Sequence, residues 1–364
     1  GWSRASKLMK NADFRSSMSM KRSFHWLIVI YMLISSKGML RSSMHGGIVA
    51  ASKIAAVAQL SSTSNKFSNL KNVAKCAAMA RQQGASMLFL PECFGFIGSS
   101  AKETRKNAEI LDFDSPKTMN TEKVNSELRS IVASELTISD FEEHERDNES
   151  VFIMDGLRTI AQTSKLWISG GGIHEVISGE ERVYNTHVIL NSEGELVKKY
   201  RKIHLFDVSI PGSVELKESN TTRPGESVEV CGSPLGVLGL TTCYDLRFPE
   251  LYTELVNRGA QIMLVPSAFT IPTGAAHWHV LLRARAIETQ TYVLAAAQVG
   301  RHNEKRESYG HALAVNPWGE VLADATDNRG PTVVCCDIDI MTHVENIRKR
   351  MPIQQHRSAA KGYK

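Results

Sequence analysis

The sequence lacks the features that identify several broad classes of protein. None of its six cysteines forms a CxxC pair, the spacing typical of zinc and redox sites. The net charge is only +5 over 364 residues, well below the basic density of a nucleic-acid binder. The apolar run at 25–35 is shorter than the ~20 residues that span a bilayer. With 42% hydrophobic residues, we expect a large buried core and free cysteines in a reducing compartment such as the cytoplasm.

Acidic residues are almost missing from the first 48 residues, which contain only Asp13 beside eight lysines and arginines. Serines are frequent there, and this composition is typical of a mitochondrial presequence. A signal-peptide core at 25–35 and a disordered extension are the alternatives. We therefore predict an N-terminal extension at 1–48 and a folded domain at 49–364.

From Ile54 onward, short apolar runs alternate with segments of helical period, which predicts an α/β domain. The predicted strands cover residues 54–60, 87–91, 166–173, 184–190, 196–203, 237–242, 261–265, 292–298, 312–315, 321–323 and 332–339. The predicted helices cover residues 67–83, 154–164, 248–257 and 277–289. Residues 191–195 and 316–319 have the composition of hairpin turns. Residues 116–150 are polar, and we interpret them as a solvated insertion with at most a loose helix.

The strongest local signal is Gly239-Leu-Thr-Thr-Cys-Tyr-Asp-Leu-Arg-Phe-Pro-Glu250, in which an apolar strand ends at Cys243 and a helix follows. Such a turn places the thiol at the carboxyl edge of a sheet, where backbone N–H groups face an anion. A free thiol has a pKa of about 8.5, so attack at neutral pH requires a base or a nearby cation. The structural alternative is a small buried side chain, which describes most free cysteines.

A carboxylate and an ammonium elsewhere in the sequence meet these requirements. Glu92 directly follows a buried strand, and burial would raise its pKa and suit it to accept the thiol proton. Lys202 lies in a basic run next to apolar residues, and a buried ammonium needs acids such as Glu92 and Glu218 around it. The structural alternatives are a helix-start partner for Glu92 and a solvated basic cluster for Lys202.

Three segments of the chain resemble, in order, the signature blocks of the nitrilase (carbon–nitrogen hydrolase) superfamily. They are Leu90-Pro-Glu92, Tyr200-Arg-Lys-Ile-His-Leu205 and Thr241-Thr-Cys-Tyr-Asp-Leu-Arg-Phe-Pro-Glu250. The resemblance covers roughly residues 54–362 and implies an αββα sandwich. The polar insertion is longer than the usual link of the family, and Thr241-Thr242 replaces a small or apolar pair.

The resemblance also implies a role for each residue of a catalytic set. Glu92 would be the general base, Lys202 would stabilise the oxyanion, and Cys243 would be the nucleophile. The second glutamate of the family matches Glu218 better than Glu215. No metal or organic cofactor is required by this mechanism. A homo-oligomer is implied, with residues 341–355 at an interface, and neither nucleic acid nor a membrane is expected as a partner.

Four further stretches, at 266–269, 273–278, 283–290 and 295–305, resemble the deaminated-glutathione amidases of the Nit branch more than its ω-amidases. The implied reaction gives 2-oxoglutarate and cysteinylglycine, and the alternative is an ω-amidase acting on 2-oxoglutaramate or 2-oxosuccinamate. These substrates are anionic, so cationic and hydroxyl groups are expected near the cysteine. The candidate oxyanion and substrate-binding residues are Tyr244, through its backbone N–H, Arg247, Phe269, Thr270, Thr273 and His277.

Two other functions remain open from the sequence. A cysteine–histidine hydrolase of another fold would use His174, His204 or His277 as its base. A non-catalytic interaction protein would have no thiol-dependent turnover. Arg283 and Arg285, on a predicted helix, fit substrate binding and structural ion pairs equally well.

Overall fold

The computed structural model describes residues 53–111, 122–134, 148–176, 178–208, 216–360 and 362. The predicted extension at 1–48 lies outside the described residues, as does much of the polar insertion. Within the described ranges, no helix combines the length and the apolar character needed to cross a bilayer.

The first sheet contains the strand that leads to Glu92. Its strands are β1 (Lys53–Leu60), β2 (Ala85–Phe89), β3 (Trp167–Glu175), β4 (Tyr184–Leu190), β5 (Leu196–Arg201), β12 (Ala297–Arg301), β13 (Glu307–Tyr309) and β16 (Thr332–Ile338). Their order is β13-β12-β1-β2-β3-β4-β5, with β16 paired to β1. Because β1, β2 and β3 are parallel, the residues after their carboxyl ends lie along one edge of the sheet.

The second sheet contains the strand that leads to Cys243. Its strands are β8 (Val230–Ser233), β9 (Gly236–Leu240), β10 (Ile262–Leu264), β11 (Tyr292–Ala295), β14 (Leu313–Val315) and β15 (Val321–Asp324). They are ordered β15-β14-β11-β10-β9-β8, and β9, β10 and β11 are parallel. A separate small pair consists of β6 (Asp207–Val208) and β7 (Leu216–Lys217).

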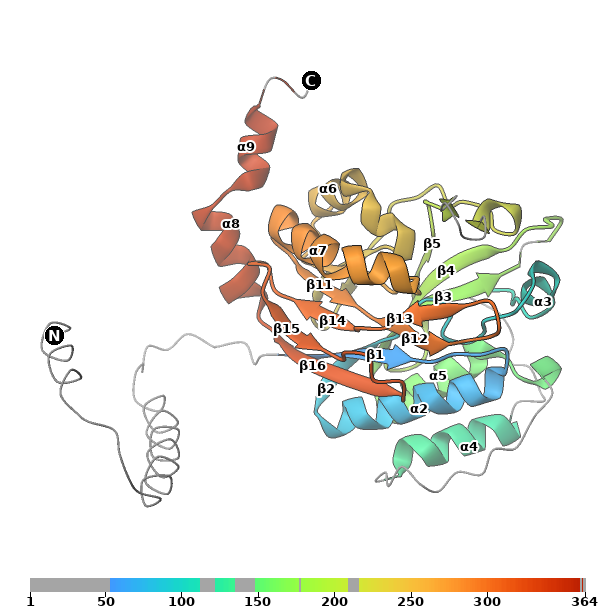
Figure 1. The fold of residues 1–364 in the computed structure, drawn as a ribbon. Helices are drawn as coiled ribbons and strands as arrows, with labels where there is room; N and C mark the ends of the chain where they lie inside the picture. Colours follow the sequence, from blue (N-terminus) through green and yellow to red (C-terminus); the bar gives the residue numbers. More distant parts are fainter. Residues whose placement is uncertain are drawn as a thin grey trace, which may run out of the picture. The chain divides into compact units, whose positions relative to one another are not determined.

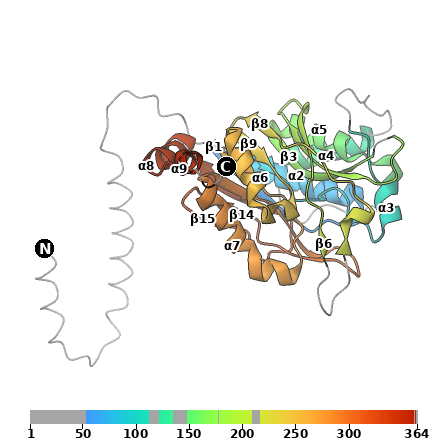
Figure 2. The ribbon, with the colours of Figure 1, turned by 90° about the horizontal axis from the view of Figure 1, so that it is seen from above.

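Helices cover the outer faces of the two sheets (Figures 1 and 2). On the first sheet these are α2 (Lys66–Gln82), α4 (Glu122–Ala133) and α5 (Ile153–Ser164), and on the second sheet α6 (Pro249–Asn257) and α7 (Ile271–Thr289). Three shorter helices are α3 (Ala101–Lys106), α8 (Asn346–Arg350) and α9 (Ile353–Ala359). The layers follow the order αββα, which confirms the fold implied by the resemblance.

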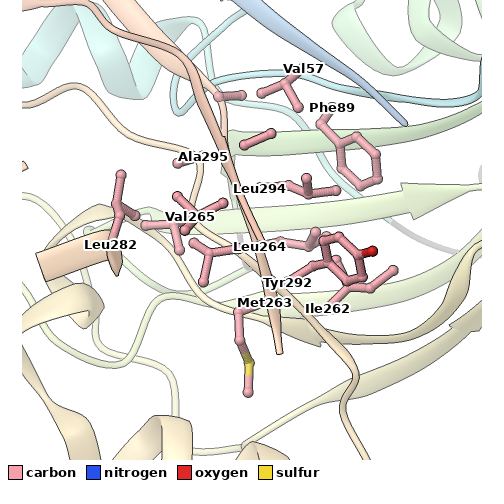
Figure 3. Close-up of a cluster of buried hydrophobic side chains, with 14 of the residues drawn as sticks. Val57, Phe89, Ile262, Met263, Leu264, Val265, Leu282, Tyr292, Leu294 and Ala295 are labelled. Atoms are coloured by element: carbon pink, nitrogen blue, oxygen red, sulfur yellow. The ribbon is translucent and has the colours of Figure 1, made fainter. Parts of the chain in front are cut away.

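Alternation along β1 produces the two apolar cores. Val57 points to the other sheet, and Figure 3 shows it and Phe89 near Leu264 and Leu294 of β10 and β11. Ala56, Ala58 and their neighbours point the opposite way and pack against α2, α4 and α5. The period of two in side-chain direction therefore builds one core between the sheets and one beneath the helices.

Two predicted boundaries are wrong in an informative way. The apolar run 292–298 is not one strand, because β11 ends at Ala295 in the second sheet and β12 begins at Ala297 in the first. Each half of the run is buried, so its composition alone does not reveal the crossing. Helix α7 begins at Ile271 rather than at residue 277, with Pro272 in its first turn, where a missing N–H is tolerated.

The interpretation of 116–150 as a solvated insertion with at most a loose helix also needs correction. Residues 122–133 form the 12-residue helix α4, which packs against α2 and α5. Its buried residues recur at helical spacing and are Val124, Leu128, Ile131 and Val132. The polar composition of the segment concealed this narrow apolar stripe, which is enough to dock a helix.

Candidate active site

Glu92 lies just beyond the carboxyl end of β2 and is only 3% exposed. Its Oε1 accepts hydrogen bonds from Lys202 Nζ at 3.0 Å and Asn185 Nδ2 at 2.8 Å. Its Oε2 accepts one from the backbone N–H of Ala268 at 3.1 Å, and Gln298 Nε2 donates to its backbone carbonyl at 3.0 Å. Donors that lie in or just beyond strands of both sheets therefore fix the carboxylate.

Lys202 lies one residue beyond β5 and is buried between two carboxylates. Besides its bond to Glu92, its Nζ donates to the two carboxylate oxygens of Glu218 at 3.1 and 2.9 Å. The backbone N–H of Phe206 donates to Glu218 Oε2 at 2.7 Å, which orients this second glutamate. Two acids offset the cost of burying the ammonium. The alternative glutamate, Glu215, lies outside the described residues.

Cys243 occupies a sharp turn after β9, with a φ of 51°. This left-handed conformation is uncommon for residues other than glycine. Its backbone N–H donates to the carbonyl of Pro266 at 2.9 Å, and the N–H of Thr242 donates to Asp245 Oδ2 at 2.8 Å. A 3-10 turn, η3 (Cys243–Arg247), begins at the cysteine. The thiol of Cys243 is hydrogen-bonded to Glu92.

The buried side chain of Asp245 holds this turn against the first sheet. Its Oδ2 also accepts a hydrogen bond from Tyr200 Oη at 2.7 Å. Its Oδ1 accepts from the backbone N–H of His204 at 3.0 Å and lies 2.7 Å from His204 Nδ1. Tyr200 and His204 flank Lys202 in the chain. Asp245 therefore links the cysteine turn to the segment that carries the lysine.

The charges of the site define its resting state at neutral pH. Burial raises the pKa of the Cys243 thiol well above its ordinary value, and Glu92 raises it further. Burial lowers the pKa of Lys202, but Glu218 and Glu92 outweigh this effect and raise it well above its ordinary value. The site therefore holds a neutral thiol beside an ammonium ion.

The expectation that burial raises the pKa of Glu92 is wrong in its net direction. Burial does act to raise it, but the charges of Lys202 and Arg306, with hydrogen bonds from Cys243 and Lys202, lower the pKa below its ordinary value. Arg306 comes from a distant loop, and the strength of the combined effect of the two cations depends on how the chain folds around Glu92. Glu92 is consequently ionised and ready to accept a proton, which is the state a general base requires.

Arg247 gathers several of the predicted substrate-binding residues around itself. Its guanidinium lies 5.8 Å from the ring centre of Tyr244 and 5.7 Å from that of Phe269, and its Nη2 is 3.3 Å from His277 Nδ1. Phe269 is buried against Trp278, with ring centres 4.7 Å apart. These side chains form one wall next to the cysteine turn.

The remaining predicted positions have mainly structural partners. Thr270 is the N-cap residue of α7, and its hydroxyl lies 2.8 Å from that of Thr273. Arg283 Nε donates to the carbonyl of Gly319 at 2.8 Å, and Arg285 Nε donates to that of Leu246 at 3.0 Å. The two arginines therefore stabilise the fold, one of the two interpretations left open by the sequence.

The three histidines considered as alternative bases contact groups other than Cys243. His174 Nε2 lies 3.8 Å from the sulfur of Cys93, and burial lowers the pKa of this histidine to about 4. His204 bonds to Asp245, and its ring stacks on Phe248 with centres 3.6 Å apart. The carboxylate of Glu92, and none of these histidines, is the side chain that the structure places at the Cys243 thiol.

Sequence reasoning missed two residues of the site. Asn185 is a polar residue in the fully buried strand β4, and this pattern was its only signal. Arg306, in the loop between β12 and β13, is exposed over the residue as a whole, but burial of its guanidinium acts to lower its pKa, and the charges of Cys93, Glu92, Cys243 and Glu218 outweigh this effect and raise it. Within the described residues, no hydrogen bond or ion pair occupies its guanidinium. No local pattern distinguishes it from other loop arginines.

Comparison with known proteins places this site in a family. The model of the carbon–nitrogen hydrolase family matches residues 54–345, most of the chain. The chain belongs to the carbon–nitrogen hydrolase family. It is therefore an enzyme that hydrolyses carbon–nitrogen bonds of amides.

Individual members of this carbon–nitrogen hydrolase family are similar over nearly the whole domain. A protein of Bos taurus named deaminated glutathione amidase is 42% identical over 308 residues, which cover 84% of this chain and 81% of that protein. The crystal structure of Saccharomyces cerevisiae Nit3, of branch 10 of the nitrilase superfamily, is 29% identical with a TM-score of 0.67, over 86% of this chain and 98% of that one. The C. elegans NitFhit structure is 36% identical with the same TM-score, over 84% of this chain and 65% of that one.

Proposed function

We propose that the enzyme hydrolyses the amide bond of deaminated glutathione to 2-oxoglutarate and cysteinylglycine through a thioester on Cys243. The observation that carries the chemistry is the contact of a neutral thiol with an ionised carboxylate, Glu92, which also bonds to a buried ammonium, Lys202. The relatives named deaminated glutathione amidase support the choice of substrate.

In the first half of the reaction, Glu92 takes the proton of Cys243 as the sulfur attacks the amide carbonyl carbon. The negative charge that develops on the carbonyl oxygen is stabilised by Lys202 and by the backbone N–H of Tyr244. The carbon–nitrogen bond then breaks, and the leaving amine takes the proton from Glu92. A thioester remains on Cys243.

In the second half, Glu92 removes a proton from water, and the hydroxide attacks the thioester carbonyl. The carbon–sulfur bond breaks, the acid leaves, and the proton returns to the sulfur of Cys243. Glu218 keeps Lys202 charged and in place throughout. The pKa of Glu92, lowered by its cations, keeps the base ionised before each half begins.

Two arginines support an anionic substrate. Arg306 has a guanidinium whose donors bond to none of the residues that the structure describes, in the electrostatic neighbourhood of Cys243, and Arg247 lies beside the cysteine turn. A guanidinium binds a carboxylate through two parallel hydrogen bonds. Deaminated glutathione carries carboxylates on either side of its amide, and we assign one to each arginine.

The test compares release of 2-oxoglutarate from deaminated glutathione and from 2-oxoglutaramate, by the enzyme and by its Cys243→Ala variant. Cys243-dependent release that favours deaminated glutathione in kcat/KM is expected. Release that favours 2-oxoglutaramate would assign the enzyme as an ω-amidase. Turnover of neither substrate would refute the proposed substrate class.

The arginines have their own test with the same assay. Arg306→Gln should raise KM for deaminated glutathione by about tenfold or more, since a charge-assisted hydrogen bond contributes roughly 1.5–3 kcal/mol. Lys305→Gln, in the same loop, is the matched control and should leave KM unchanged. Equal effects of the two substitutions would contradict a specific role for Arg306.

We further propose a homo-oligomer that buries an apolar face of α7. Val280 and Ile287 on this helix are 68% and 46% exposed, and Trp318 is 61% exposed. The turn at Gly319 contacts Ile287, so these side chains belong to one surface. Sedimentation of the unsubstituted protein and of its Val280→Glu variant tests the proposal. The unsubstituted protein should be an oligomer that the substitution dissociates, and a monomeric unsubstituted protein would refute the proposal.

We also propose that the protein is directed to mitochondria as well as to the cytoplasm. The basic, serine-rich composition of residues 1–48 supports this proposal. A fluorescent protein fused after residue 48 tests it. Fluorescence in the cytoplasm alone would refute the presequence.

A further inference from the structure

A second cluster of ligand-type side chains lies where α7 meets the edge of the second sheet, outside the proposed catalytic residues. It contains His279 of α7, His311 just before β14, and Asp324 at the end of β15. Figure 2 shows α7 beside β14 and β15, and the helix contacts β14. Among the described residues, this is the one group of three such side chains whose ligand atoms all lie within 4.8 Å of one another.

The distances within the cluster are close to those of a coordination shell. His279 Nε2 lies 3.0 Å from Asp324 Oδ2, and His311 Nδ1 lies 3.0 Å from Asp324 Oδ1. Zinc bonds of 2.0–2.2 Å in a tetrahedral site separate neighbouring ligand atoms by about 3.3–3.5 Å. Small side-chain movements would therefore admit an ion between the three groups.

The backbone holds two of the ligands before any ion binds. His311 has a φ of 59°, its N–H donates to the carbonyl of Thr326 at 2.9 Å, and its carbonyl accepts from Trp278 Nε1 at 2.8 Å. The N–H of Thr326 in turn donates to Asp324 Oδ1 at 2.7 Å. Trp278 precedes His279 in α7, so the same contact that fixes His311 also sets the position of the other histidine.

The environment distinguishes this cluster from a buried hydrogen-bonded triad. The side chains of His279, His311 and Asp324 are 35%, 21% and 25% exposed, so solvent reaches the ligand atoms and can complete the shell. Imidazole and carboxylate together suit Zn²⁺ and similar ions, whereas Mg²⁺ and Ca²⁺ prefer oxygen ligands alone. We propose that His279, His311 and Asp324 bind one divalent transition-metal ion of the Zn²⁺ type, with water at the open positions.

Binding at this site involves no redox or group-transfer step. Each imidazole coordinates through a neutral nitrogen, so the proton that it now directs at Asp324 moves to its other ring nitrogen or to solvent. The ion would connect α7 to both β14 and β15, because its three ligands come from those elements. Amide hydrolysis does not depend on it in this proposal.

The direct test is equilibrium dialysis with Zn²⁺ in a Cys243→Ala background, which removes the catalytic thiol as a competing ligand. We expect one equivalent of Zn²⁺ to bind, and His279→Ala and Asp324→Asn each to weaken binding by about tenfold or more. His356→Ala removes an exposed histidine elsewhere and should change nothing. Unchanged affinity in both ligand variants would overturn the proposal, as would competition by an equal concentration of Mg²⁺.

A second readout does not depend on counting ions. At a free Zn²⁺ concentration about 100 times the dissociation constant, the Tm of the Cys243→Ala protein should rise by several degrees, and this shift should disappear in His279→Ala. His279 is a half-buried helix residue, and alanine favours a helix, so the variant is expected to fold. A Tm shift of equal size in both proteins would contradict binding at this cluster.

Discussion

Two cysteines follow strand ends in the two sheets and adopt nearly the same unusual backbone conformation. Cys93 follows β2 with a φ of 55°, and Cys243 follows β9 with a φ of 51°. Both are almost fully buried, and in both thiols burial, followed by the charge of Glu92, raises the pKa. Neither the turn nor the thiol pKa therefore identifies the nucleophile.

The hydrogen-bonding partners separate the two cysteines. The Cys243 thiol bonds to the carboxylate of Glu92, which bonds to Lys202, so an ionised carboxylate and a buried ammonium lie together beside this thiol. The sulfur of Cys93 lies 3.8 Å from His174 Nε2, at the outer limit for a hydrogen bond to sulfur. Two thiols with the same backbone conformation therefore differ in their partners, and of the two it is Cys243 that bonds to a carboxylate paired with an ammonium.

Removing each thiol in turn should give the largest difference between the two cysteines. Cys243→Ala should lower kcat by at least about 10⁴-fold, because no nucleophile remains. Cys93→Ala should keep kcat within about threefold of the unmodified enzyme. Both are measured as 2-oxoglutarate release, with circular dichroism to verify folding. Equal losses in the two variants would show that the partners do not decide which thiol reacts.

Lys202→Met tests the contribution of the ammonium that bonds to Glu92. We expect kcat to fall by roughly 10²–10³-fold, the usual effect of losing one oxyanion-stabilising group. The control is Lys198→Met, which removes a lysine from an ion pair with Glu229 outside the site. A loss in KM alone, with kcat retained, would assign Lys202 to substrate binding.

Asp245→Asn tests how the turn at Cys243 is held. Both carboxylate oxygens of Asp245 accept hydrogen bonds, whereas the side-chain amide of asparagine has only one oxygen that can accept them. A buried donor therefore loses its partner, which lowers the free energy of unfolding by about 1–3 kcal/mol. The urea midpoint should fall, and kcat should fall by roughly tenfold as Cys243 loses its position. Asp327→Asn, at an exposed position, is the control. An unchanged midpoint would argue against this support.

The pH dependence should show the smallest effect. The pKa of Glu92 lies below its ordinary value of 4.5, so the base is lost only as the pH falls below that value. The thiol of Cys243 ionises only above its ordinary value of 9.0. We therefore expect kcat/KM to change by less than about threefold between pH 6 and 8. An inflection near pH 6.5 would instead indicate a histidine base.

Two of the three central groups could be predicted from the sequence alone because each follows an apolar run that ends abruptly. Glu92 and Cys243 come just after buried strands, and the resemblance added Lys202, whose basic run alone suggested a solvated cluster. The residues that tune these groups were less visible. Asn185 and Arg306 approach from another strand and a distant loop, and their positions depend on how the strands pair.

The errors in the fold have similar causes. The run 292–298 has uniform composition, yet the chain passes from one sheet to the other at Ala296, because both destinations are buried. Helix α4 was missed because four apolar positions were spread through a polar segment. The net pKa shift of Glu92 was also missed, because the cations that set its direction come from other parts of the chain.

The pairing of β1 with β16 has a consequence for biosynthesis. Lys53 pairs with Ile338 and Gln59 with Thr332, so the first described strand completes its hydrogen bonding only when the last described strand is available. At about 5–20 residues per second, a ribosome needs on the order of half a minute to supply it. Until then one edge of β1 lacks this partner and presents unpaired backbone groups, which can pair with another chain.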